Sequence, residues 1–476
     1  MMEVTEQFIL LQAPNPAAAE NGRKLWKKGS FSGLCQTEDG AVCWGECAGS
    51  GKTPYRVSID WTNAQAPVCR CSCPSRQFPC KHALGLMFGM LEKSPFAVEA
   101  LPQELAEKQA KQAARAAKKA QTAAKPKKTN TAAQKKKLSR QLEGLDMAEK
   151  MIGDLLTAGA GTLAGASAQS YDKLAKDLGS CYLTGLQASF ARLALTVREI
   201  QKAPQGAQRG YAQALNILVA LRSTIKKSRV FLQEKLDAGA YSAEDTLLFE
   251  ALGGVWKLED LRAIGSVREN ARLVQLSFDV SLDPVKKEYV ERGWWLDLDT
   301  GCIDQTLNYR PLKALKYVKG EDSCFALLEV PLLCLYPGEG NRRIRWESCA
   351  SRPVTPQEQA ALPALAQPGL AQAVKLAKGQ FKNTLLPKYM AVLVPVGRLG
   401  QVDGALVLED PAGERLRLRD RAEDGPDHAC TARLSMLDVR PGSALFGLLF
   451  YDESDRTICL HPYSLVTPEQ TARLLF

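Results

Sequence analysis

The sequence predicts an α+β protein with a small N-terminal zinc-binding module, a basic linker, a helical domain and a C-terminal β-rich region. Half of the fourteen cysteines lie within the first 80 residues. Apolar residues then recur with a helical period, and after about residue 250 the period changes to that of strands. We place the segments at these boundaries: 1–98 for the zinc module, 99–137 for the linker, 138–249 for the helical domain, 250–350 for a β-rich domain, and 351–476 for a short helix with a second β-rich subdomain.

Composition and length describe an ordinary globular protein of several domains. Hydrophobic residues make up 45% of the chain and charged residues 24%, as in typical soluble proteins. No apolar run approaches the roughly 18 residues of a membrane helix, and no basic segment precedes the first apolar run, as it would in a secretory signal. We therefore expect a cytoplasmic protein. In a reducing cytoplasm, crowded cysteines indicate metal binding or catalysis rather than disulfides, and the seven scattered ones are expected to be buried.

Four potential zinc ligands lie in the segment CRCSCPSRQFPCKH at 69–82. Cys71 and Cys73 are two residues apart, so on an extended chain both side chains leave the same face. Pro79 suits the entry to a helix beginning near Cys80, which would turn Cys80 and His82 back toward the first pair. Three thiolates and one imidazole complete a tetrahedral Zn²⁺ site, and a closed site is structural.

The Cys-x-Cys, six residues, Cys-x-His pattern resembles the SWIM zinc finger, and its flanks are similar to bacterial SWIM zinc finger proteins. The segment WGECAGSGKTPY at 44–55 is similar to the stretch upstream of the finger, and the specific resemblance covers about residues 22–98. It implies zinc on Cys71, Cys73, Cys80 and His82, and a finger that binds DNA or proteins. It also implies a MoxR-type ATPase or a von Willebrand factor A protein as a partner.

Four other cysteines near the finger do not form the two close pairs usual for structural zinc. They are expected to be buried or partly exposed thiols, and Cys69 is the one placed to substitute as a ligand. These residues are Cys35, Cys43, Cys47 and Cys69.

The net charge of +10 is concentrated in one segment. Residues 101–140 contain twelve Lys or Arg and two Glu, which gives +10 and leaves the rest of the chain close to neutral. The segment is either a solvated tether or a sequence-independent contact for nucleic-acid phosphates. The lysines that we select as candidate contacts are Lys118, Lys119, Lys125, Lys127, Lys128, Lys135, Lys136 and Lys137.

Strands are predicted at 273–280, 294–299, 324–330, 390–397 and 404–409, with a hairpin turn at 410–413. Residues 355–380 return to helix, and the last ~90 residues are a candidate for a small barrel. Asp297 and Asp299 are expected at a solvated edge. The basic and aromatic stretch 342–346 is expected on a solvated strand face.

No catalytic constellation is apparent, because neither His428 nor His461 has a serine or cysteine motif beside it. The first hypothesis is a non-enzymatic adaptor whose finger recognises a protein or a nucleic acid. The alternative is a sequence-independent DNA-binding protein that uses the basic linker. An enzyme with a site in the C-terminal half is the weakest hypothesis.

Overall fold

The computed structural model forms two compact units, Met1–Lys128 and Thr129–Phe476. The structure describes residues 4–13, 16–49, 53–62, 67–75, 79–110, 131–165, 167–203, 207–239, 246–315, 320, 322–421 and 428–475.

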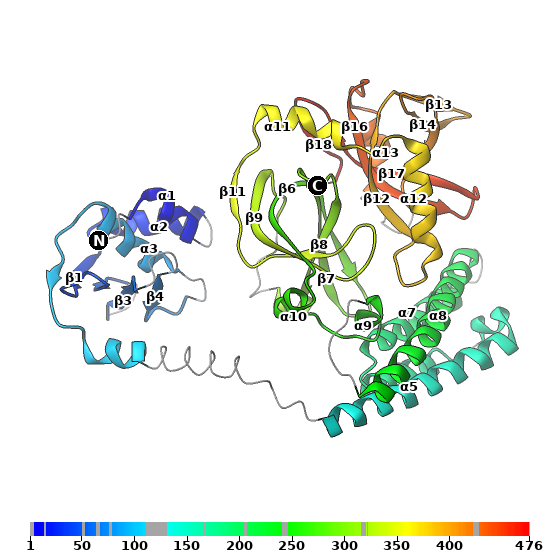
Figure 1. The fold of residues 1–476 in the computed structure, drawn as a ribbon, viewed down its shortest axis with the longest axis horizontal. Coiled ribbons are helices and arrows are strands. Elements are labelled where there is room, and N and C mark those ends of the chain that lie inside the picture. Colours follow the sequence, from blue (N-terminus) through cyan, green and yellow to red (C-terminus); the bar gives the residue numbers. More distant parts are fainter. Residues whose placement is uncertain are drawn as a thin grey trace. The chain divides into compact units, whose positions relative to one another are not determined.

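The first unit combines a five-stranded sheet with helices (Figure 1). The sheet order is β4-β3-β2-β1-β5, with β1 and β5 parallel and the other neighbours antiparallel. Its elements are α1 (Glu6–Gln12), α2 (Pro16–Lys27), β1 (Phe31–Gln36), β2 (Val42–Cys47), β3 (Tyr55–Asp60), β4 (Val68–Cys71), α3 (Lys81–Leu91) and β5 (Ala97–Val98).

Helix α3 is the centre of the first unit. Its residues 82–89 are all buried, and a helix that is apolar on every side must be covered on every side. Ile59 of β3 and Ile9 of α1 belong to the same core. Helix α2 approaches closely because Gly22 has no side chain: a Cβ there would lie 2.9 Å from the Leu84 Cβ. The core thus fixes the N-terminal end of α3 beside the sheet.

The second unit begins with helices, as the spacing predicts. They share one core, to which Leu145, Leu178, Phe190 and Ile225 contribute. The four long helices are α5 (Thr131–Ala158), α6 (Ala168–Ser180), α7 (Thr184–Lys202) and α8 (Gln208–Ala238), and two short ones follow, α9 (Leu247–Ala251) and α10 (Leu258–Ala263). Residues 131–137 therefore belong to α5.

A nearly closed barrel follows the helices. Its strands are β6 (Val267–Asp283), β7 (Glu288–Asp297), β8 (Ile303–Pro311), β9 (Ala326–Leu335) and β10 (Ile344–Arg345), in the order β10-β9-β6-β7-β8, and β11 (Ala350–Pro353) adds to β9. Strand β6 pairs with both β7 and β9, and a bulge between Gln275 and Ser277 helps it to bend. A parallel bridge between Gln305 and Arg343 connects β8, at one edge of the sheet, to the residue before β10, at the other edge.

The third sheet has the order β12-β16-β17-β15-β14-β13, with β18 paired to β17. Helix α12 packs beside β12 (Figure 1). The elements are α11 (Pro356–Ala361), α12 (Leu370–Lys382), β12 (Tyr389–Pro395), β13 (Arg398–Val402), β14 (Ala405–Glu409), β15 (Arg415–Leu418), α13 (Cys430–Leu434), β16 (Ala444–Asp452), β17 (Thr457–Val466) and β18 (Thr471–Arg473). The predicted turn at 410–413 joins β14 to β15.

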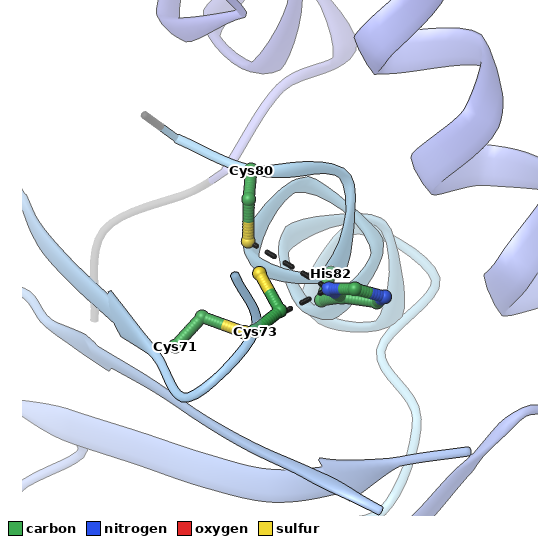
Figure 2. A group of neighbouring side chains, drawn as sticks. All are labelled: Cys71, Cys73, Cys80 and His82. Atoms are coloured by element: carbon green, nitrogen blue, oxygen red, sulfur yellow. Dashed lines mark hydrogen bonds between the residues drawn. The ribbon is translucent and has the colours of Figure 1, made fainter. Parts of the chain in front are cut away.

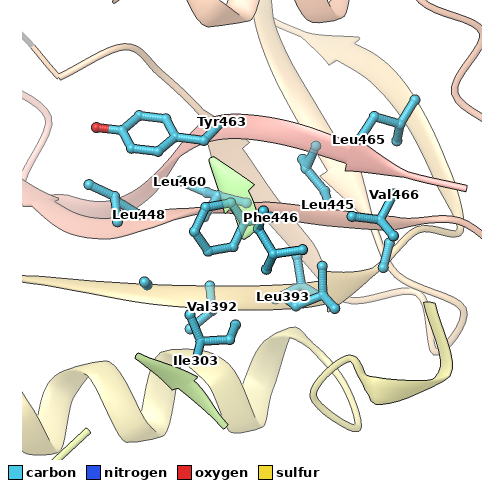
Figure 3. Packing of buried hydrophobic residues seen from close by; sticks show 14 of the residues in the cluster. Ile303, Val392, Leu393, Leu445, Phe446, Leu448, Leu460, Tyr463, Leu465 and Val466 are labelled. Carbon is cyan, nitrogen blue, oxygen red and sulfur yellow. The ribbon is translucent and has the colours of Figure 1, made fainter. Parts of the chain in front are cut away.

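One hydrophobic core joins the barrel to the third sheet (Figure 3). Trp294 and Ile303 on the outside of the barrel pack with Val392 and Phe446 of the third sheet. The rings of Trp294 and Phe446 have their centroids 6.2 Å apart. The predicted C-terminal barrel is therefore present, but it is built from β6–β10 rather than from the last ninety residues.

Two expectations for polar residues in this region need correction. Asp297 is buried, with only 1% of its side chain exposed, and Arg268 Nη1 lies 2.5 Å from its Oδ2, whereas Asp299 is 46% exposed. The two carboxylates therefore do not share a solvated edge. In the stretch 342–346, Ile344 and Arg345 form strand β10, and Arg345 is exposed as expected. Arg342 instead donates to backbone oxygens of Tyr336 and Leu335 and holds a loop in place.

Candidate metal centre

Three elements of the first unit position the four predicted ligands. Cys71 ends β4, where its pairing with Val57 of β3 fixes the backbone. Cys73 lies in the turn that follows. Cys80 is the N-cap of α3, and His82 lies in the first turn of that helix. The helix therefore begins where the sequence predicts, and it brings the second ligand pair back to the first.

The ligand atoms of Cys71, Cys73, Cys80 and His82 lie within 4.8 Å of one another (Figure 2). Nδ1 of His82 lies 3.7 Å from the Cys71 Sγ and 3.9 Å from the Cys80 Sγ. A tetrahedral zinc ion at its usual bond lengths separates a thiolate sulfur from an imidazole nitrogen by about 3.6 Å. The arrangement fits Zn²⁺, with Nδ1 as the histidine donor.

The thiols of the cluster differ in acidity. A hydrogen bond from the Cys71 thiol, aided by His82 and by the backbone N–H of Ala83, lowers the pKa of Cys80 well below its usual range. The same hydrogen bond raises the pKa of Cys71. One thiolate is therefore already favoured at the N-terminus of α3, where the helix dipole stabilises negative charge. Zinc binding must displace the remaining protons.

The surroundings hold the imidazole in place. The ring of Tyr55 packs against His82 with centroids 4.9 Å apart, and both Cys80 and His82 are buried. Sequence reasoning did not identify Tyr55 as part of the site. Its position at the start of a strand carries no signal of proximity to His82, which is 27 residues further along the chain.

The other N-terminal cysteines lie outside this cluster. Cys35, Cys43 and Cys47 are buried and Cys69 is half-buried. Burial raises the pKa of Cys43 and Cys47 to about 11 and that of Cys69 to about 12, which favours neutral thiols. Cys43 contacts the sulfur of Met90 in the core at 3.3 Å. Of the seven scattered cysteines, Cys302 and Cys349 are exposed and Cys324 is half-buried. Cys302 and Cys349 lie in solvent-facing connections directly before β8 and β11.

A second group of potential ligands lies in the third sheet of the second unit. Asp420, Cys430 and His461 offer atoms within 4.8 Å of one another. Both ring nitrogens of His461 have hydrogen-bond partners within the protein. Nδ1 accepts from the Arg421 N–H at 3.4 Å, and Nε2 lies 3.1 Å from the His428 carbonyl oxygen. The sequence shows no cysteine motif beside His461, but α13 brings Cys430 to it in space.

The candidate nucleic-acid contacts are only partly within the described residues. Lys135, Lys136 and Lys137 are exposed near the start of α5, and the Lys137 Nζ lies 5.8 Å from the centroid of the Tyr182 ring. The other five lie outside the described residues: Lys118, Lys119, Lys125, Lys127 and Lys128.

Comparison with known proteins assigns the finger. No curated protein and no solved structure matches the chain. In the part of the chain that the structure describes, no helix has the length and apolar character needed to cross a membrane. Residues 55–88 match the family model of the SWIM zinc finger. This match begins at Tyr55, includes all four potential ligands and ends inside α3, so residues 55–88 are a SWIM zinc finger domain whose cofactor is Zn²⁺.

Proposed function

We propose that this protein is a non-enzymatic cytoplasmic adaptor whose SWIM finger presents a zinc-stabilised surface to a protein or nucleic-acid partner. The observation that supports this role is the closed ligand set of the site. Four protein ligands fill the tetrahedral coordination of zinc and leave no position for a substrate or an activated water. The metal then stabilises the fold of the finger, and the finger acts by recognising its partner.

The resemblance of residues 22–98 to bacterial SWIM proteins narrows the choice of protein partner. A MoxR-type ATPase or a protein with a von Willebrand factor A domain is the partner class that we propose. Near the finger, the side chains of Arg56 and Lys81 are exposed, so an acidic surface on the partner would complement this part of the finger.

The adaptor role predicts partner binding that depends on the zinc site. Tagged full-length protein should retain a partner after nuclease treatment, and Cys80→Ser should lose it because the finger surface is no longer ordered. Cys302→Ser, which changes an exposed cysteine outside the finger, is the matched control and should retain it. Equal retention by both variants, measured by quantitative mass spectrometry, would place recognition outside the finger.

The second candidate function, DNA binding by the linker, has its own support. The charge of +10 in 101–140 equals that of the whole chain, and the three lysines at the start of α5 are exposed. Lysine contacts to phosphates give affinity without base readout, so binding to duplex DNA would be independent of sequence.

For this second role we expect duplex affinity to fall steeply with salt. Each neutralised phosphate contributes about −0.9 to the slope of log affinity against log salt, so six contacts lower affinity roughly a thousandfold between about 50 and 200 mM. Replacing the eight candidate lysines by glutamine should abolish duplex binding and leave zinc content unchanged. Duplex affinity that survives this replacement, measured by fluorescence anisotropy, would exclude the linker as the contact.

A further inference from the structure

The strands of the barrel have a specific connectivity. β6, β7 and β8 form a meander, and β9 returns to pair with β6. β10 pairs with β9, and next to it the Gln305 N–H donates to the Arg342 carbonyl oxygen at 2.9 Å, closing β8 against this edge in parallel. This is the order of the five-stranded OB barrel. The general binding surface of that barrel is the face of its second and third strands, bordered by the loops after its first and fourth strands.

In this protein the second and third strands are β7 and β8, and the two loops are 284–287 and 336–343. The register pairs Tyr309 with Val290 and Trp294 with Gln305. Paired residues lie on one face of a sheet, and Trp294 packs outside the barrel against the third sheet. Tyr309 therefore lies on the outer face, where it is 43% exposed.

Each loop supplies a cation to this tyrosine. The Lys286 Nζ, from the loop after β6, lies 5.3 Å from the centroid of the Tyr309 ring. The guanidinium of Arg343, from the loop after β9, lies 5.5 Å from the same centroid. Both cations lie over the ring, so a base that stacks on Tyr309 takes the place of one of them, while its phosphates stay within reach of both charges.

Further cations and aromatic rings lie along the same outer face. Arg292, two residues from Trp294 on β7, has its guanidinium 5.7 Å from the centroid of the Tyr389 ring at the start of β12. Lys287, beside Lys286, is exposed, and so is Lys388 next to Tyr389, whose Nζ donates to the carbonyl oxygens of Phe381 and Asn383. Cations and rings thus alternate from the loop 284–287 to β12.

Three carboxylates moderate this charge, and one of them, Glu339, is an exposed residue of the loop 336–343. Glu288 lies 3.7 Å from the Lys286 Nζ, and Glu250 of α9 lies 3.6 Å from Arg343 Nη1. The cations Lys286, Lys287, Arg292, Arg343 and Lys388 outnumber them. A neutral oligosaccharide would gain little from such a face, whereas a polyanion with exposed base faces matches both the rings and the charges.

The geometry points to a binding site for single-stranded nucleic acid on the outer face of β7 and β8, with a base stacked on Tyr309 and phosphates on Lys286 and Arg343. The site goes beyond the proposed function, because it belongs to the barrel and needs neither the zinc finger nor the linker. Duplex DNA fits poorly, since its bases are stacked on one another and offer no free face to the ring.

The test uses the full chain with the eight candidate linker lysines changed to glutamine, so that linker binding does not contribute. A fluorescein-labelled oligothymidylate of about 15 nucleotides and a duplex of equal length are titrated at low salt. We expect the single strand to bind more tightly than the duplex. Tyr309→Ala should weaken single-strand binding about 5- to 150-fold, because one stacking contact is lost, and Tyr309→Phe should restore it.

Tyr451→Ala is the matched control, since Tyr451 is 49% exposed on the third sheet. It should leave the affinity unchanged. Lys286→Gln should lower the slope of log affinity against log salt by about 0.7. Equal effects of Tyr309→Ala and Tyr451→Ala, equal affinity for single strand and duplex, or no binding at low salt would each overturn the site. Zinc-dependent partner retention would be untouched by any of these outcomes, so the two proposals fail separately.

Discussion

Replacing Cys80 by serine is expected to release one equivalent of zinc per chain and to unfold the finger. Cys80 supplies a ligand from the N-cap position of α3, and that helix is the centre of the first core. Binding energy at a structural zinc site is folding energy, worth roughly 10–16 kcal/mol in zinc-finger peptides. Elemental analysis measures the zinc, and amide hydrogen exchange across residues 81–91 measures the loss of protection.

The second unit should be unaffected by this substitution. The clusters of its core contain only residues of that unit, so its thermal transition should stay in place while that of the first unit disappears. Cys302→Ser is again the control and should keep the full zinc content. A single transition that shifts for the whole chain in Cys80→Ser would contradict the division into two units.

Asp304→Asn is expected to stabilise the second unit at neutral and alkaline pH. Burial inside the barrel raises the pKa of Asp304 to about 6, despite the opposing charge of Arg268. The unfolded value is 3.8, so above about pH 6 the folded state must hold an ionised carboxylate that it disfavours. Two pKa units correspond to roughly 3 kcal/mol, which is the upper bound of the gain. The Arg342 N–H that donates to Oδ1 at 3.0 Å keeps its acceptor in the amide.

The pH dependence identifies the cause of this gain. As pH falls from 6 to 3.8, the folded wild type binds a proton that the unfolded chain does not, so its stability rises and the advantage of Asp304→Asn disappears. Urea unfolding at pH 8 and at pH 4.5 measures the difference. Asp299→Asn alters an exposed carboxylate whose pKa is lowered by a hydrogen bond from Arg272, and it should not stabilise the protein at either pH. A gain for Asp304→Asn of equal size at both pH values would contradict the burial argument.

Local patterns were sufficient to predict the finger. Ligand spacing and the helix entry at Pro79 concern residues within one turn or hairpin of each other, so Cys71, Cys73, Cys80 and His82 could be identified together. The four long helices and the turn at 410–413 follow from periodicity and turn chemistry for the same reason.

Features that depend on distant parts of the chain could not be predicted in this way. The barrel closes through a bridge between Gln305 and Arg343, and no period or motif joins these positions. Asp297 is buried beside Arg268, which lies 29 residues earlier in the chain, so its local sequence resembled that of an exposed strand end. Likewise, Cys430 and His461 meet because α13 packs on β17, although a cysteine two residues after His428 was visible in the sequence.

The shared core of the barrel and the third sheet also bears on the order of events in folding. The meander β6–β8 needs only short loops and is expected to form early, because closing a short loop loses little chain entropy. Its outer face, with Trp294, is covered only after Phe446 arrives from about 150 residues later in the chain. Ser464 then donates to the Leu276 carbonyl oxygen, and Arg473 to that of Gln275. During synthesis on the ribosome, the half-made barrel therefore exposes an apolar surface until β16 and β17 emerge, and this interval is when the nascent chain is most prone to aggregation and most in need of a chaperone.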